Sequence, residues 1–271
     1  MRELIGVFAP LTTPFDPDGA LNIEQLASNM KQYAKSGLHG YLALGSNGES
    51  KMLTTQEKLE VVQCIAAHKA QNQVLIAGSI FESTRETINF SVEAQSRGAD
   101  CIALLPPSYF KRQMTDAALI QYFTDVASAL RIPCTLYKAP QYAGGMDISA
   151  NVILECAKHP NIVGMKDSIV TPTHTSMILH AVDTTKFKVY SGFDDQFLLN
   201  ISNGGQGCIG ALANIVPDIW SKLILSANKH DFNNTFYLAG LINRLSQLYS
   251  WVSNPAVLIK QLMIHRGLSI Q

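Results

Sequence analysis

Short apolar segments alternate with longer amphipathic segments along the whole chain. The apolar runs are four to seven residues long, which is the length of buried strands. Between them, apolar residues recur at helical spacing, as at Leu26, Met30 and Tyr33. Thr54-x-x-Glu57 and Ser83-x-x-Glu86 each predict a capping box at a helix start. We expect eight strands, at Ile5–Leu11, Gly40–Leu44, Val74–Ser79, Cys101–Leu105, Cys134–Lys138, Ile162–Lys166, Lys188–Ser191 and Gly207–Leu212.

Eight strand–helix repeats predict an α/β fold, a closed (β/α)8 barrel of the TIM type. Parallel strands need helical crossovers, and eight of them close into a barrel. An open, doubly wound sheet is the alternative, but the number and even spacing of the strands favour the barrel. Helical patterns continue at Asp218–Lys229, Asn233–Trp251 and Pro255–His265. We therefore expect a barrel in residues 1–215 and a C-terminal helical extension in residues 216–271, packed together as a single structural unit.

Composition and charge exclude several classes of function. The 271 residues are 47% hydrophobic, and 21 basic residues balance 21 acidic ones. This balance gives no general attraction to nucleic acid or to an anionic membrane. The chain has no run of 18 consecutive apolar residues, so no membrane span is predicted. Five cysteines without a C-x-x-C pair, and an N-terminal apolar run interrupted by Pro10 and Pro14, favour a cytoplasmic protein.

The loop after the second expected strand has the composition of a small anion-binding turn. Barrel enzymes place their active sites at the carboxyl ends of the strands, and this strand leads into Gly45-Ser46-Asn47-Gly48-Glu49. Its two glycines permit unusual backbone angles, so that amide groups can turn toward one point. With the Ser46 and Asn47 side chains, the loop would suit a carboxylate. The same residues also fit an ordinary tight turn.

Two lysines stand at the ends of neighbouring strands, and side-chain alternation separates them. The fifth strand ends in Leu136-Tyr137-Lys138 and the sixth in Gly164-Met165-Lys166. Because successive side chains point to opposite faces of a strand, Tyr137 and Lys138 cannot both face the barrel interior. With Tyr137 and Lys166 facing inward, a phenol and an amine lie side by side in an apolar mouth. Lys138 then points toward the helices or the rim.

This pair of side chains suits covalent catalysis on a carbonyl compound. Only a neutral amine attacks a carbonyl to form a Schiff base, and a low-dielectric pocket favours the neutral form of a lysine. A neighbouring tyrosine can transfer the protons that carbinolamine formation and carbon–carbon cleavage require. A surface lysine at a strand end is the alternative. Tyr109, which follows Pro106 and Pro107 after the fourth strand, is a further candidate that also fits simple packing.

Motifs for nucleotide binding, metal binding and serine hydrolysis are either absent or lie in the wrong structural context. Gly205-x-Gly207-x-x-Gly210 has the letters of a dinucleotide fingerprint, but it falls in the eighth strand and not in a strand-to-helix turn. The seven histidines show no metal-ligand spacing, and no G-x-S-x-G elbow is present. The motifs therefore do not favour a nucleotide cofactor, a metal site or a serine hydrolase.

Several motifs together stand in the order and spacing of one family. Over roughly residues 3 to 267, the chain resembles the dihydrodipicolinate synthase and N-acetylneuraminate lyase family of class I, Schiff-base-forming aldolases. Each matching stretch is weak alone, but together they are highly specific. The stretches are Gly45-Ser46-Asn47-Gly48-Glu49, Pro106-Pro107-Ser108-Tyr109-Phe110, Leu136-Tyr137, Ile162-Val163-Gly164-Met165-Lys166-Asp167-Ser168 and Ser191-Gly192-Phe193-Asp194-Asp195.

The resemblance implies a role for each matching residue. Lys166 would form the Schiff base with pyruvate or another 2-oxo acid, and Tyr137 would transfer protons and orient the substrate carboxylate. The Ser46–Asn47 loop would receive that carboxylate. Tyr109 would complete a proton relay in the adjacent subunit of a homotetramer. No metal or organic cofactor is implied. The residues expected to line the pyruvate pocket are Gly192 and Ile209.

Within the family, the motifs are most similar to those of 4-hydroxy-2-oxoglutarate aldolase and related aldolases of 2-oxo-3-deoxy acids. Dihydrodipicolinate synthases typically carry Thr-Thr in place of Ser46-Asn47. Where this chain has Tyr142, they carry an arginine that binds the distal carboxylate of aspartate semialdehyde. Ser46, Asn47 and Ser168 would have to hold any distal carboxylate here, unless Lys138 curls back over the rim.

We therefore expect reversible cleavage of a 4-hydroxy-2-oxo acid to pyruvate and an aldehyde. Two other functions remain open. One is dihydrodipicolinate synthase, which condenses pyruvate with aspartate semialdehyde. The other is a non-catalytic regulatory protein that binds a 2-oxo acid without turning it over. The presence of Lys166, Tyr137 and Tyr109 together favours the enzyme.

Overall fold

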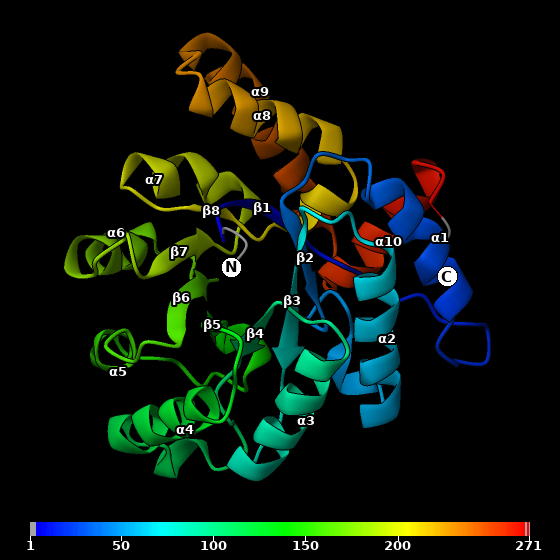
Figure 1. Ribbon diagram of the computed structural model, residues 1–271. Helices are drawn as coiled ribbons and strands as arrows, with labels where there is room; N and C mark the ends of the chain where they lie inside the picture. The colour runs from blue at the N-terminus through cyan, green and yellow to red at the C-terminus, as the bar shows by residue number, and fades with distance from the viewer. Residues whose placement is uncertain (1–3, 269, 271) are drawn as a thin grey trace.

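The computed structural model describes residues 4–268 and 270, and it confirms the closed eight-stranded barrel (Figure 1). The strands are parallel and adjacent in chain order, and β8 pairs with β1 to close the sheet. The strands are β1 Gly6–Pro10, β2 Gly40–Ala43, β3 Val74–Ser79, β4 Cys101–Leu104, β5 Cys134–Lys138, β6 Ile162–Asp167, β7 Lys188–Ser191 and β8 Gly207–Cys208.

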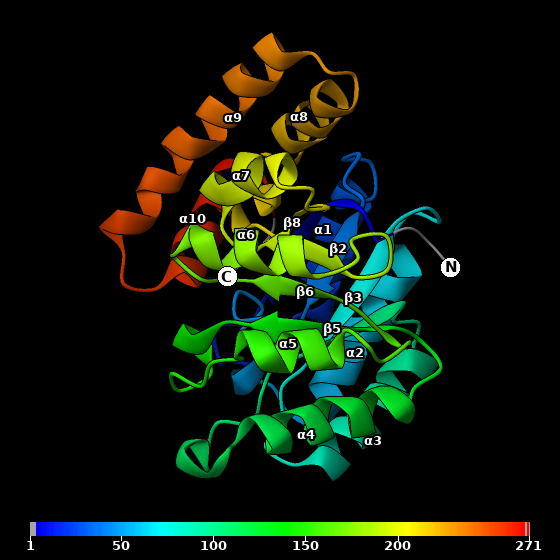
Figure 2. The ribbon, with the colours of Figure 1, turned by 90° about the vertical axis from the view of Figure 1, so that its left-hand side faces the viewer.

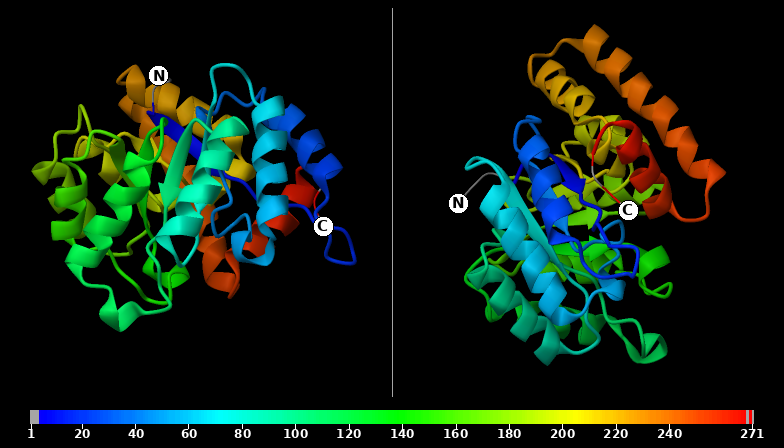
Figure 3. Two further views of the ribbon diagram at one scale, coloured as in Figure 1. Left: turned by 60° about the horizontal axis from the view of Figure 1, so that its bottom comes forward. Right: turned by 90° about the vertical axis from the view of Figure 1, so that its right-hand side faces the viewer.

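A helix follows each strand, and these helices form a layer around the barrel (Figures 1 and 3). Thr54 forms the predicted capping box with Glu57. Ser83 accepts a hydrogen bond from the Glu86 amide, but within the described residues the Glu86 side chain returns no bond, so the second predicted box is only half formed. The helices are α1 Ile23–Tyr33, α2 Thr55–His68, α3 Thr84–Ser96, α4 Asp116–Ser128, α5 Ala150–Cys156, α6 Pro172–Ala181, α7 Phe197–Ser202 and α8 Pro217–Asn228.

The strands are buried on both faces. Apart from Val163 and Lys188, every strand residue is buried, because helices cover the outside of a parallel sheet and side chains fill the inside. Phe8 of β1 and Tyr190 of β7 are not on neighbouring strands, yet their rings meet edge to face with centroids 5.7 Å apart. Side chains therefore fill the middle of the barrel.

β8 is shorter than predicted, ending at Cys208 instead of Leu212. The segment after it forms a 3-10 turn, Ala211–Asn214. The Leu212 amide donates to the Asp194 carboxylate at 3.2 Å, and the Asn214 side-chain amide donates to the Pro10 carbonyl at 3.0 Å. Side-chain hydrogen bonds therefore replace strand pairing in this segment, and the hydrogen-bond ladder of β8 ends before it.

Two further helices follow α8, namely α9 Phe232–Ser246 and α10 Pro255–His265, with the 3-10 turn Gln247–Trp251 between them. The long α9 lies along α8 (Figure 2). On α10, Lys260 Nζ lies 2.7 Å from a Glu49 carboxylate oxygen and 4.6 Å from the centroid of the Phe15 ring. The helix α10 is thereby attached to the loops at the mouth of the barrel. No helix in the described part of the chain is long and apolar enough to cross a membrane.

Candidate active site

A cavity of about 310 Å³ opens at the carboxyl ends of the strands, where barrel enzymes place their active sites. The β2–α2 loop, the ends of the strands from β5 onward and the C-terminal extension bound this space, which we call the mouth cavity. Its lining residues are Ser46, Asn47, Tyr137, Gln141, Tyr142, Lys166, Ser168, Val170, Gly192, Phe193, Asp194, Asp195, Gln196, Ile209, Ala211, Ser246, Tyr249 and Pro255.

Lys166 and Tyr137 lie side by side in the mouth cavity. They are register partners on β6 and β5, and both side chains face inward, as the alternation predicted. Lys166 Nζ is 4.6 Å from the centroid of the Tyr137 ring, and the two residues are only 5% and 1% exposed. The face of an aromatic ring stabilises a positive charge placed over it. A cationic adduct on Nζ would therefore be stabilised here.

The β2–α2 loop has a strained backbone and two amide groups without a hydrogen-bond acceptor in the described part of the chain. Leu44 and Glu49, on either side of it, have φ angles of 59° and 50°. This left-handed region costs a residue with a side chain roughly 1–3 kcal/mol. The amides of Ser46 and Asn47 have no acceptor among the described residues, and Ser46 Oγ lies 3.2 Å from the Tyr137 hydroxyl. These donors lie beside Tyr137 and are chemically suited to an anion.

The other predicted pocket residues also line the mouth cavity. Gly192 has no space for a side chain, because a Cβ would fall 2.0 Å from Ser168 Oγ and 2.9 Å from the Asp167 carbonyl oxygen. Its amide donates to that carbonyl at 2.6 Å, which holds the exits of β6 and β7 together. Ile209 adds an apolar wall. The fold thus brings these residues to the same cavity as Lys166.

Tyr142 lies at the open side of the mouth cavity and is 43% exposed. Burial of the phenol, and then the nearby Tyr137, raise its pKa above the usual value. Tyr142 is therefore a neutral hydrogen-bonding group where an arginine would have placed a positive charge.

Tyr109 lies outside the mouth cavity of its own chain. It is 79% exposed, and its ring contacts Phe110 edge to face, with 4.9 Å between the centroids. The Glu82 carboxylate accepts hydrogen bonds from the Ser108 and Tyr109 amides at 2.7 and 2.9 Å, which fixes the turn. The expected role of Tyr109 in an adjacent subunit stays a prediction.

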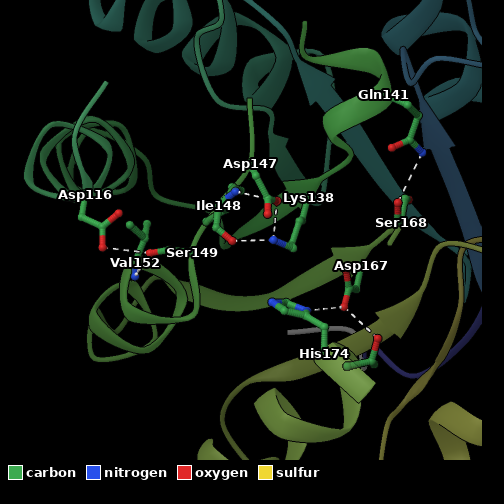
Figure 4. Close-up of polar contacts among 11 residues, drawn as sticks. Asp116, Lys138, Gln141, Asp147, Ile148, Ser149, Val152, Asp167, Ser168 and His174 are labelled. Carbon is green, nitrogen blue, oxygen red and sulfur yellow. Dashed lines mark hydrogen bonds and ion pairs between the residues drawn. The ribbon is translucent and has the colours of Figure 1, made fainter. Parts of the chain in front are cut away.

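Lys138 does not reach the rim, so the idea that it curls back over the substrate is wrong. Alternation along β5 turns its side chain to the outer side of the sheet, where it is 1% exposed. Its Nζ pairs with the Asp147 carboxylate and donates to the Ile148 carbonyl (Figure 4). Lys138 therefore supplies no charge to the mouth cavity.

Asp194 and Tyr249 line the cavity although neither was a predicted site residue. Asp194 Oδ2 accepts a hydrogen bond from the Tyr249 hydroxyl at 3.0 Å, and its Oδ1 accepts one from the Leu212 amide at 3.2 Å. Gly210 makes room for this carboxyl, since a Cβ there would lie 2.2 Å from Oδ1. Burial raises the pKa of Asp194 to about 7. The mouth cavity is therefore lined by a further titratable group, Asp194, in addition to Lys166.

Asp194→Asn should remove a pH dependence of stability. The folded protein holds the Asp194 proton to about pH 7, whereas an unfolded aspartate releases it near pH 4. The folded state therefore binds more protons over this interval, and the free energy of unfolding falls as the pH rises through it. Urea unfolding at pH 5 and pH 8 measures the fall, which should be smaller in the variant than in the wild type. Asp195→Asn, at an exposed neighbour, should behave as the wild type. An equal fall in all three proteins would contradict this expectation.

The charges in the mouth cavity are few and unevenly placed. Among the lining residues, Lys166 is the only basic one, whereas Asp194 and Asp195 are acidic. Amides and hydroxyls of Gln141, Gln196 and other residues supply neutral hydrogen-bonding groups. Within residues 4–268 and 270, no three His, Cys, Asp or Glu side chains gather as metal ligands would.

The sequence is similar to known proteins over most of its length. A profile described as the Dihydrodipicolinate synthetase family matches residues 3–271. The 4-hydroxy-tetrahydrodipicolinate synthase of Methanococcoides burtonii is 35% identical over 265 residues, which are 97% of this chain and 89% of that protein. A probable mitochondrial 4-hydroxy-2-oxoglutarate aldolase of Emericella nidulans is 34% identical over 224 residues, which are 80% of this chain and 71% of that protein.

Solved structures show the same fold. YagE, a prophage protein of the dihydrodipicolinic acid synthase family from E. coli K12 solved with pyruvate, superposes with a TM-score of 0.93 at 28% identity. The match covers 99% of this chain and 90% of that one. The dihydrodipicolinate synthase of Acinetobacter baumannii complexed with pyruvate gives a TM-score of 0.90 at 29% identity, with the same coverage of 99% and 90%.

Proposed function

The chain belongs to the dihydrodipicolinate synthetase family of lyases and aldolases, and from this premise we propose that it cleaves a 4-hydroxy-2-oxo acid to pyruvate and an aldehyde. The observation that carries the proposal is Lys166 Nζ over the Tyr137 ring, beside the free amides of the β2–α2 loop. The pyruvate in two similar solved structures supports pyruvate as the product that stays on the lysine. The reaction is reversible.

The proposed chemistry proceeds on Lys166. The neutral amine attacks C2 of the 2-oxo acid, and loss of water leaves an iminium. The substrate carboxylate accepts hydrogen bonds from the Ser46 and Asn47 amides. Tyr137, whose hydroxyl is 3.2 Å from Ser46 Oγ, takes part in removing the proton of the C4 hydroxyl. The electron pair of the C3–C4 bond moves to the iminium and the aldehyde leaves. The enamine is then protonated at C3, and water releases pyruvate and the free amine.

The far side of the mouth cavity favours a hydroxylated chain over a second carboxylate. Asp194 and Asp195 stand there, with neutral groups such as Gln196 and Tyr249 and without any cation besides Lys166. The exposed Asp195 can accept hydrogen bonds from substrate hydroxyls, whereas a second substrate carboxylate would find no positive charge there. We therefore propose a 2-oxo-3-deoxy sugar acid as the substrate class.

A second candidate is 4-hydroxy-2-oxoglutarate. The similarity to the aldolase of Emericella nidulans supports it, and Ser46, Asn47 and Ser168 are the donors that would hold its distal carboxylate. These donors are neutral, so this substrate would be held less firmly than at a site with an arginine.

Steady-state kcat/KM on one preparation tests the proposed function. Cleavage of a 2-oxo-3-deoxy sugar acid should exceed cleavage of 4-hydroxy-2-oxoglutarate, and both should exceed condensation of pyruvate with aspartate semialdehyde by at least about tenfold. A hydrogen bond to a charged group contributes about 1.5–3 kcal/mol, and Tyr142 offers none of the charge that an arginine would. Tyr142→Arg is the matched variant and should narrow the gap. Condensation that exceeds every cleavage reaction would contradict the assignment.

Tyr109 can take part in the proposed reaction only when copies of the chain associate. It is exposed beside Phe110, which is also exposed, and it does not line the mouth cavity of its own chain. We propose that it enters the relay of a neighbouring subunit in a homotetramer, where its hydroxyl would connect Tyr137 with solvent.

A further inference from the structure

We propose that Lys138 and Asp147 form a clasp that positions the β5–α5 loop, residues 139–149, and thereby determines how the aldehyde half of the substrate is held. The clasp consists of Lys138 Nζ, the Asp147 carboxylate and the Ile148 carbonyl. The inference rests on the proposed function, which assigns the inner part of the mouth cavity to the 2-oxo acid.

The clasp ties the end of the loop to its beginning. Lys138 is the last residue of β5, and its two acceptors lie nine and ten residues further along the chain. The Asp147 carboxylate also accepts a hydrogen bond from the Ile148 amide at 2.9 Å, which orients it toward the lysine. Without the clasp, the ends of the loop would lose a restraint and its backbone would sample more conformations.

The loop carries two residues of the mouth cavity. Gln141 and Tyr142 lie in the short 3-10 turn Pro140–Tyr142, and both line the cavity. Gln141 Nε2 donates to the Ser168 carbonyl at 3.3 Å, so the loop reaches across to the exit of β6 (Figure 4). Lys166 and Tyr137 lie on strands instead. A looser loop would therefore disturb the outer part of the cavity and leave the imine-forming pair in place.

The exposure of the two partners decides which substitution tests the clasp. Lys138 is 1% exposed, whereas 54% of the Asp147 side chain is exposed. Lys138→Met removes the buried ammonium, keeps most of its volume and leaves a carboxylate that water can solvate. Asp147→Asn keeps an acceptor oxygen for Lys138 but removes the charge, so it weakens the clasp without breaking it.

The experiment measures cleavage and imine formation separately. In Lys138→Met, KM for the cleavage substrate should rise between about 10-fold and 100-fold, because a small misplacement of positioning groups has effects of this size. Discrimination between two 4-hydroxy-2-oxo acids that differ beyond C4 should fall. Half-saturation by pyruvate in borohydride trapping should stay within about twofold, since Lys166 and Tyr137 do not move. Lys158→Met, which removes an exposed ion pair with Glu155, is the matched control and should change nothing.

Asp147→Asn should raise KM by an intermediate factor, and it provides the test if Lys138→Met does not fold. The double variant should be no worse than Lys138→Met alone, because both substitutions act on the same interaction and Lys138→Met already removes it. Wild-type KM and discrimination in both folded single variants would overturn the clasp, and so would an equal loss of pyruvate trapping. Absence of trapping and cleavage in the wild type would overturn the proposed function itself, and the inference with it.

Discussion

Lys166→Ala should abolish turnover and the pyruvate adduct together while the fold persists. Among the described residues that line the mouth cavity, Lys166 alone carries an amine, and loss of a covalent nucleophile lowers kcat on the order of 10⁴–10⁶-fold. The residue lies at the mouth, so alanine leaves the packed layers of the barrel unchanged. Borohydride reduction with pyruvate, followed by peptide mass spectrometry, should find one pyruvyl group on the Lys166 peptide of the wild type and none in the variant. Circular dichroism checks the fold.

The neighbouring lysine provides the control for this experiment. Lys138→Met should keep the adduct, because Lys138 Nζ is held by Asp147 and Ile148 on the other side of the sheet. An adduct found on Lys138 would contradict the strand register in which Tyr137 pairs with Lys166. Full turnover by a well-folded Lys166→Ala protein would remove the Schiff base from the mechanism.

The barrel could be predicted because its strands are buried on both faces. Such strands read as continuous apolar runs, and the runs at Val74–Ser79, Cys134–Lys138 and Lys188–Ser191 have the bounds of the observed strands. For the eighth strand, the predicted end at Leu212 was wrong, because β8 ends at Cys208. Residues 209–212 are apolar because they are buried near the mouth, but Leu212 donates its amide to Asp194 and not to a strand. Hydropathy reports burial and cannot tell these two environments apart.

The inner part of the site could be predicted for a similar reason. Alternation along a strand is a local rule that separates Tyr137 from Lys138, and once the fifth and sixth strands are neighbours with both side chains facing inward, Tyr137 and Lys166 lie together. The partners of Lys138 and Asp194 follow no local rule. Asp147 comes nine residues after Lys138 in an irregular loop, and Tyr249 comes 55 residues after Asp194. Only the folded chain brings these groups together, so the contacts of Lys138 and the presence of Asp194 and Tyr249 in the cavity were not predicted.

Tyr137→Phe should lower kcat about 10²–10⁴-fold, the usual contribution of a positioned proton-transfer group. The substitution removes the hydroxyl beside Ser46 Oγ but keeps the ring under Lys166 Nζ, so the lysine should still form a slow, trappable adduct with pyruvate. Two rates measure the effect, namely steady-state cleavage and exchange of the pyruvate methyl protons with deuterated water. Both should fall if Tyr137 also transfers protons at C3, because the enamine carbon gains a proton in cleavage and both loses and gains one in the exchange.

Tyr142→Phe is the matched control, since it removes the same phenol oxygen from the open side of the same cavity. Tyr142 is 43% exposed and Tyr137 is 1% exposed, so water can replace the Tyr142 hydroxyl but not that of Tyr137. We expect Tyr142→Phe to lose less than about tenfold in kcat, with its effect mainly on KM. The opposite order of the two variants would assign proton transfer to the loop tyrosine. The Lys138–Asp147 clasp would then govern kcat instead of KM, because that clasp positions Tyr142.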